Sequence, residues 1–92
     1  MDTAVLCEVS RGLRESEKTV AVTDIRGRRE FLRIEGSYLR CHGDRTYLPV
    51  GLVYEHPASN SVLIELPLEA DSGVRRMFVP RQDVLLRERV PA

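Results

Sequence analysis

Two cysteines and two histidines are the side chains whose chemistry would first suggest a metal site or a nucleophile. Cys41 and His42 are adjacent, whereas Cys7 and His56 lie far from them along the chain. Structural zinc sites use closely spaced cysteine pairs, and the chain has none. Adjacent residues of a strand point to opposite faces, which argues against Cys41 and His42 as nucleophile and base. We expect no metal, no cofactor, and two buried thiols in a reducing compartment.

The acidic and hydroxyl residues of EADSG, residues 69–73, are the next candidates for catalysis. Glu69, Asp71 and Ser72 fall within one predicted turn. Asp, Ser and Gly are also the residues that a tight turn requires, so no reaction is needed to explain them. The chain contains no phosphate-binding glycine motif, no H-E-x-x-H and no G-x-S-x-G. We expect a protein that is not an enzyme; an active site built from scattered residues is the alternative.

Arginine is concentrated in one short segment of the chain. Arg26, Arg28 and Arg29 surround Gly27, and Arg33 follows on the next predicted strand. Planar guanidinium groups suit bidentate contacts with carboxylates and phosphates, so these four arginines are the predicted binding residues. The alternative is codon bias in a GC-rich genome, because every basic residue of the chain except Lys18 is an arginine.

Net charge alternates along the chain although the whole chain is neutral. Residues 26–45 hold six basic and three acidic residues, and residues 75–92 hold five and two. Residues 1–25 hold three basic and five acidic residues, and residues 46–74 hold four acidic residues and no basic one. Patches of opposite sign suit docking to a charged protein partner or to a second copy of the chain. A solvated, self-compensating surface is the alternative.

The elements that must position these residues are predicted to be strands. Apolar residues alternate with period two in TVAVT, EFLRIE and SVLIELPLE, and helical spacing does not persist beyond a few residues. Alternation in YLPVGLVYE places Tyr54 on the same face as Leu52. Such one-sided strands suit a small curved sheet with one packed face. The predicted buried face consists of Val20, Val22, Leu32, Ile34, Leu48, Val50, Leu52, Val62, Ile64 and Leu66.

Turns at regular intervals support a chain of consecutive hairpins. Combinations of Gly, Pro, Asp, Asn and Ser mark four of them, at residues 24–27, 42–45, 56–60 and 70–73. The polar segment 11–18 predicts the longest loop. This spacing is typical of a small barrel or sandwich. Because 92 residues can bury one small core, we predict a single domain over residues 1–92.

The stretch RRMFVPRQDVLL, residues 75–86, predicts how the barrel closes. Pro80 lacks an N–H donor and belongs at a strand end, where it can begin a tight turn. A strand, a Val-Pro step, one 3-10 turn and a short closing strand resemble the end of an SH3-like barrel. Residues 51–86 are also similar to the second half of PRC-barrel domains. We therefore predict an all-β, five- or six-stranded antiparallel SH3-like barrel with a single 3-10 turn near residues 80–83.

The resemblance and the charge pattern together limit the function. Peptide-binding SH3 domains line their groove with aromatic residues, whereas this chain has no Trp, three Tyr and two Phe. The similarity to PRC barrels implies an adaptor that docks on a larger assembly. We expect a protein-interaction module that uses opposite-charge patches, with an unidentified protein partner or self-association. The alternative is a small barrel that binds RNA or single-stranded nucleic acid, because RGRREFLR combines arginines with an aromatic residue.

Localisation is predicted from two negative features of the sequence. The N-terminal stretch MDTAVLCEVS lacks the basic and apolar regions of a signal peptide. The longest apolar stretch, LPVGLVY, is far shorter than the roughly 20 residues that span a bilayer. We expect a cytoplasmic protein without membrane contact.

Overall fold

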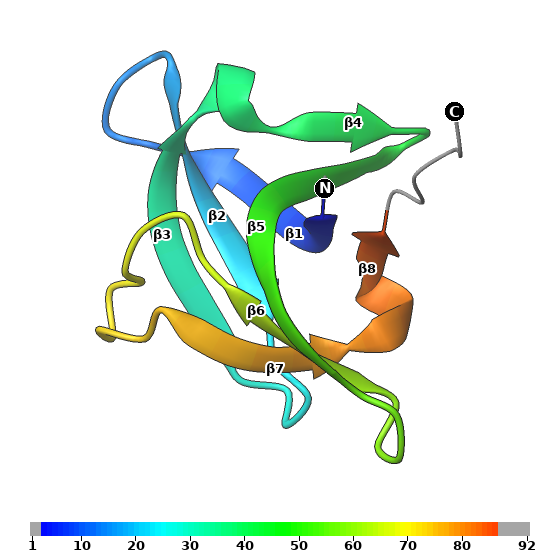
Figure 1. Cartoon of the computed structure of the whole chain (residues 1–92). Coiled ribbons are helices and arrows are strands. Elements are labelled where there is room, and N and C mark those ends of the chain that lie inside the picture. The colour runs from blue at the N-terminus through cyan, green and yellow to red at the C-terminus, as the bar shows by residue number, and fades with distance from the viewer. Residues whose placement is uncertain (1–2, 87–92) are drawn as a thin grey trace.

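The computed structural model describes residues 3–86, which form one curled antiparallel sheet (Figure 1). Its strands are β1 (Thr3–Arg11), β2 (Glu17–Thr23), β3 (Arg29–Glu35), β4 (Arg40–His42), β5 (Arg45–His56), β6 (Ser61–Glu65), β7 (Arg76–Pro80) and β8 (Val84–Leu86). Two 3-10 turns, η1 (Gly36–Tyr38) and η2 (Arg81–Asp83), interrupt the strands. The all-β prediction is confirmed. In the described part of the chain there is no helix long and apolar enough to cross a membrane.

The hydrogen-bonded strand order is β3-β2-β1-β5-β6-β7, with β4 paired to β5 and β8 paired to β1. The first half of β1 pairs with β5 and β8, and its second half pairs with β2, so β1 connects the two parts of the sheet. The count of eight strands exceeds the predicted five or six. β8 is the short closing strand predicted after the turn at Pro80, whereas β4 has only three residues and shows no alternation from which it could be predicted.

The turns confirm most of the predicted connections. Gly27 adopts a φ of 84° and its N–H donates to the carbonyl of Asp24, as the DIRG stretch predicts. The η2 turn follows Pro80 directly, which confirms the predicted 3-10 turn. The second 3-10 turn, η1, was not predicted from the sequence. The 11–18 loop is shorter than predicted, because β1 continues to Arg11 and β2 begins at Glu17.

The core lies on the concave side of the sheet and is made of the alternating apolar residues. Seven of the ten predicted core residues are at most 1% exposed, namely Val20, Val22, Leu32, Leu48, Val62, Ile64 and Leu66. Ile34, Val50 and Leu52 are partly buried and pack against these seven. Val5, Cys7, Ala70, Met77 and Val79 complete the cluster.

The predicted alternation is wrong within β5. Leu52 pairs with Ile64, but the next paired residue of β5 is Tyr54, which lies opposite Leu63. Val53 is therefore an extra residue in the strand, a β-bulge that shifts the alternation by one. Tyr54 moves to the outer face of the sheet, where it is 51% exposed.

Candidate functional site

The four predicted binding arginines fall into two pairs with different surroundings. Arg26 and Arg28 lie in the turn between β2 and β3, where Oδ1 of Asp24 accepts their backbone N–H groups at 2.8 and 2.9 Å. Asp24 thus stabilises the shape of the turn through the main chain. Within residues 3–86 neither guanidinium group forms an ion pair, and both residues are exposed.

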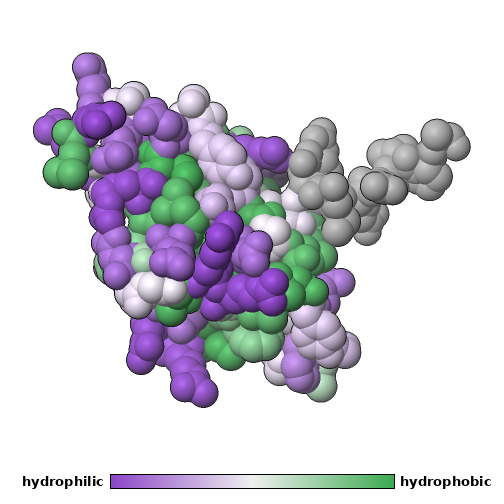
Figure 2. Space-filling model, turned by 60° about the vertical axis from the view of Figure 1, so that its left-hand side comes forward, coloured by the Kyte–Doolittle hydropathy of each residue, from purple (hydrophilic) through white to green (hydrophobic). Residues whose placement is uncertain are grey.

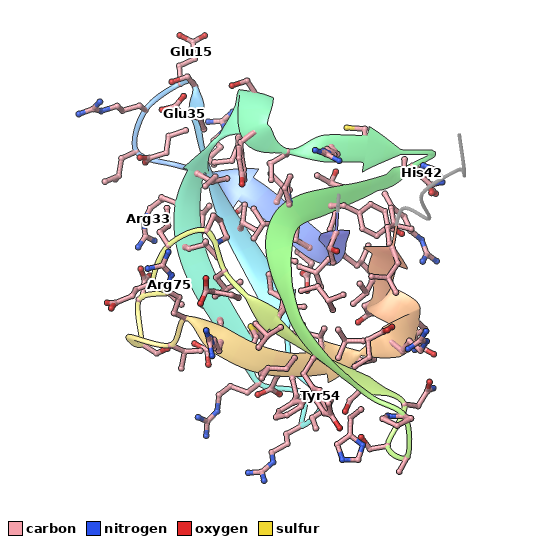
Figure 3. All side chains as sticks on the ribbon, in the orientation of Figure 1. Glu15, Arg33, Glu35, His42, Tyr54 and Arg75 are labelled. Atoms are coloured by element: carbon pink, nitrogen blue, oxygen red, sulfur yellow. The ribbon has the colours of Figure 1, made fainter. Side chains whose placement is uncertain are left out.

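Arg29 and Arg33 are already engaged inside the chain. Nη2 of Arg29 lies 3.0 Å from Oε2 of Glu8, and its guanidinium carbon lies 5.2 Å from the centre of the Phe31 ring. Arg33 projects from β3 toward the segment that joins β6 to β7 and forms an ion pair with Asp71 there (Figure 3). The structure therefore leaves Arg26 and Arg28 as the pair of predicted residues that a partner can reach without displacing a carboxylate.

The acidic stretch at residues 46–74 is mostly matched by arginines of the same chain. Glu55 lies 2.7 Å from Arg81, and Glu65 lies 3.0 Å from Arg76. With the pair between Asp71 and Arg33, three of the four acidic residues of this stretch have an internal partner. The blocks of opposite charge seen in the sequence thus become short-range ion pairs, one between the neighbouring strands β6 and β7 and two that involve the η2 turn or the loop before β7.

A hollow of about 260 Å³ lies between the β2–β3 turn and β7, and we call it the seam hollow. Its apolar lining consists of Ile25, Val74, Met77 and Phe78. Its charged lining consists of Arg26, Arg28, Arg76, Asp24 and Glu30. The backbone N–H of Ile25 donates to the carbonyl of Phe78 at 3.0 Å, so the turn is attached to β7 at this point. Figure 1 shows the β2–β3 turn passing beside β7.

An exposed apolar row continues from the seam hollow across the outer face of the sheet. Phe78 lies opposite Leu63, and Leu63 lies opposite Tyr54, so the three side chains share one face. Phe78 is 36% exposed and Ile25 is 50% exposed. Figure 2 shows hydrophobic residues that remain accessible among hydrophilic ones on one side of the molecule. Apolar side chains next to arginines are a composition typical of protein interfaces.

The residues of EADSG that could suggest catalysis have structural partners. The hydroxyl of Ser72 donates to Oε1 of Glu30, a carboxylate that is only 4% exposed. The N–H of Asp71 donates to the carbonyl of Phe31 at 2.8 Å. These bonds attach the segment before β7 to the free edge of β3 and close the gap between the two outermost strands of the sheet.

The two cysteines differ in their surroundings. Cys7 is buried, and its Sγ–H donates to the carbonyl of Thr46 at 3.5 Å. Cys41 is exposed, which contradicts the prediction that both thiols are buried, because all three residues of the short edge strand β4 face solvent. Among residues 3–86 no group of three His, Cys, Asp or Glu side chains could hold a metal ion.

This difference predicts two rates of thiol modification. Burial raises the pKa of the Cys7 thiol to about 11, so almost no reactive thiolate exists at pH 8. We expect a disulfide reagent to modify one thiol rapidly in the folded protein and the second only after unfolding, as measured by absorbance. The Cys41→Ser variant should lack the rapid phase. A rapid phase that survives in this variant would contradict the buried position of Cys7.

Sequence reasoning identified the arginines of this surface but missed its apolar part. Phe78 and Arg76 were assigned only to a strand, and their proximity to the β2–β3 turn depends on contacts across about fifty residues of chain. Ile25 was the available signal, since an exposed isoleucine at a turn position normally taken by polar residues needs an explanation. Comparisons with protein-family models, curated proteins and solved structures found no match to this chain.

Proposed function

We propose that this protein is a non-enzymatic protein-interaction module that docks an acidic partner on the surface around the seam hollow. The observation that supports this most is the placement of Arg26 and Arg28, exposed and without an ion pair in residues 3–86, beside an apolar hollow. Arginine and aromatic residues dominate the energetics of protein interfaces, and opposite charge speeds and orients docking.

A different protein is a better partner for this surface than a second copy of the chain. Self-association would pair the arginines with residues 46–74, but Glu55, Glu65 and Asp71 already have arginine partners in their own chain. An exchange of exposed ion pairs gains little, because each contributes only about 0.2–1 kcal/mol. A carboxylate supplied by another protein meets no such competition at Arg26 and Arg28.

The finer type of barrel is part of this proposal. The η2 turn after Pro80 and the pairing of β8 with β1 are the features that favour an SH3-like closure. Similarity to PRC barrels would make the protein an adaptor on a larger assembly. Fold alone does not identify a partner, so the proposed function rests on the surface around the seam hollow and not on the barrel type.

Binding of single-stranded nucleic acid is the second candidate, favoured by the exposed Phe31 ring beneath the guanidinium of Arg29. Small barrels stack bases on such rings. A carboxylate weakens this candidate, because Glu8 already forms an ion pair with Arg29 beside the Phe31 ring. A phosphate that approaches Phe31 would therefore meet the negative charge of Glu8.

The test combines a charge reversal with a matched control. The triple variant Arg26→Glu, Arg28→Glu and Arg29→Glu should lose the proteins that the wild type retains from nuclease-treated lysate of the native cell. The control reverses Arg11 and Arg14, at the opposite end of β2, and should retain them. Retention of the same proteins by the triple variant would contradict the proposal.

A direct nucleic-acid measurement separates the two candidates. We expect no binding of a generic single-stranded RNA at low salt, with protein on the order of tens of micromolar, by fluorescence anisotropy. If the wild type binds RNA and the triple variant does not, the nucleic-acid function is favoured and the protein-docking proposal is overturned.

A further inference from the structure

We propose that the seam hollow receives one apolar side chain of the partner, and that acidic residues beside this side chain contact Arg26 and Arg28. This inference rests on the proposed function, because it names the chemistry of the segment that docks. It goes beyond a match of charges, since it requires an anchor of leucine or phenylalanine size at a defined place between the β2–β3 turn and β7.

The size and lining of the seam hollow fit such an anchor. A cavity of about 150 Å³ accommodates benzene, so about 260 Å³ is enough for a leucine or phenylalanine side chain. Met77, which is 6% exposed, provides a buried floor. Ile25 and Phe78 form half-exposed walls whose remaining surface an apolar side chain would cover. An apolar side chain seated there would exclude water from these walls, which is the setting in which interface anchors contribute most.

The charges around the hollow specify the flanking residues. Arg26 and Arg28 stand on the turn without an ion pair among residues 3–86, whereas Nε of Arg76 on β7 already lies 3.0 Å from a carboxylate oxygen of Glu65. The acidic groups of the lining are otherwise engaged: Asp24 accepts two backbone N–H groups, and buried Glu30 accepts the hydroxyl of Ser72. An approaching segment therefore meets arginine side chains first. Acidic residues next to the anchor match the two arginines of the turn.

The backbone of β7 favours insertion of a side chain over addition of a strand. Strand addition requires a row of free N–H and C=O groups along an edge. At the centre of the β7 edge, the carbonyl of Phe78 already accepts the N–H of Ile25. The turn thus covers the part of the edge that borders the hollow, and recognition there depends on side chains.

Synthetic peptides test the anchor directly in the full chain. The probe is an acetylated, amidated Asp-Glu-Leu-Glu-Asp peptide, titrated into ¹⁵N-labelled protein and followed by amide chemical shifts. We expect shifts concentrated at Ile25, Val74, Met77 and Phe78. Replacing the central leucine of the peptide with alanine should weaken binding at least about tenfold, because loss of even one methylene from an apolar pocket costs about that much. A peptide with lysine in place of the acids should not bind.

Two matched variants distinguish binding in the seam hollow from non-specific attraction between charges. Ile25→Ser removes an apolar wall and leaves every arginine in place, whereas Leu13→Ser alters a 92% exposed leucine in the β1–β2 turn. We expect Ile25→Ser to lose the preference for the leucine peptide and Leu13→Ser to keep it, with unchanged circular dichroism in both.

The outcomes distinguish this inference from the proposed function. If the alanine peptide binds as well as the leucine peptide, and the triple arginine variant binds neither, the anchor is overturned and docking by charge stands. If no peptide binds but retention of the lysate proteins still requires the arginines, the anchor proposal is overturned and the proposed docking function stands. If binding depends on neither the leucine nor the arginines, both proposals are overturned.

Discussion

Replacing Ile64 with alanine is expected to lower the free energy of unfolding by about 2–5 kcal/mol. Ile64 is fully buried in the middle of β6, between Leu52 on β5 and Met77 on β7. The smaller side chain would leave a cavity beneath three strands that are held in register by their hydrogen bonds. The loss is large for a domain of this size, since small domains are stable by only about 5–15 kcal/mol.

Chemical denaturation followed by circular dichroism measures this loss. Leu63→Ala on the same strand is the matched control, because Leu63 faces the outer side and is only partly buried. It should cost clearly less than Ile64→Ala. Equal costs, or a loss below about 0.5 kcal/mol for Ile64→Ala, would mean that the faces of β6 are inverted, as a register slip of one residue produces.

The buried face was predictable from the sequence because alternation is a local property. A strand with one packed face needs an apolar residue at every second position, and Val20 with Val22 or Val62 with Ile64 meet this need within one segment. The prediction failed where one residue changed the local geometry. Gly51 was the one signal near the bulge at Val53, since a glycine inside a strand often marks a bulge, but it does not specify which residue is extra, and Tyr54 was placed on the wrong face.

The candidate surface was predictable only in part, for a different physical reason. An arginine cluster around a turn glycine is visible in the sequence, but the partners of each arginine are not. Asp71 is far from Arg33 along the chain, and it becomes a neighbour only because the segment before β7 lies along β3. The same long-range arrangement forms the seam hollow, whose two sides come from opposite ends of the curled sheet.

Replacing Gly12 with alanine is expected to lower the free energy of unfolding by about 1–3 kcal/mol, the typical cost when added atoms force a backbone shift. A Cβ at Gly12 would lie 2.5 Å from the carbonyl oxygen of Glu17 and 2.7 Å from its carbonyl carbon. That carbonyl accepts the N–H of Gly12 at 3.1 Å. The added methyl group would therefore push apart the two strands at the point where their turn closes.

Gly51→Ala is the matched control for this prediction. A Cβ at Gly51 would meet the Cβ of Glu65 at 3.6 Å, an ordinary contact in the middle of β5. This variant should stay near wild-type stability, because alanine restricts the unfolded chain without straining the folded one. Urea unfolding of both variants measures the difference. Equal midpoints would mean that the β1–β2 turn relaxes around the methyl group at little cost.

The position of Gly12 makes the same variant a control for the docking surface. The β1–β2 turn and the β2–β3 turn lie at opposite ends of β2 (Figure 1), so we expect strain at Gly12 to leave Ile25 and the arginines beside it unchanged. We expect folded Gly12→Ala protein to bind the leucine peptide as the wild type does. Weakened peptide binding at a temperature where the variant is still folded would contradict this expectation. It would mean that the β1–β2 turn, acting through β2, helps to fix the position of the β2–β3 turn relative to β7.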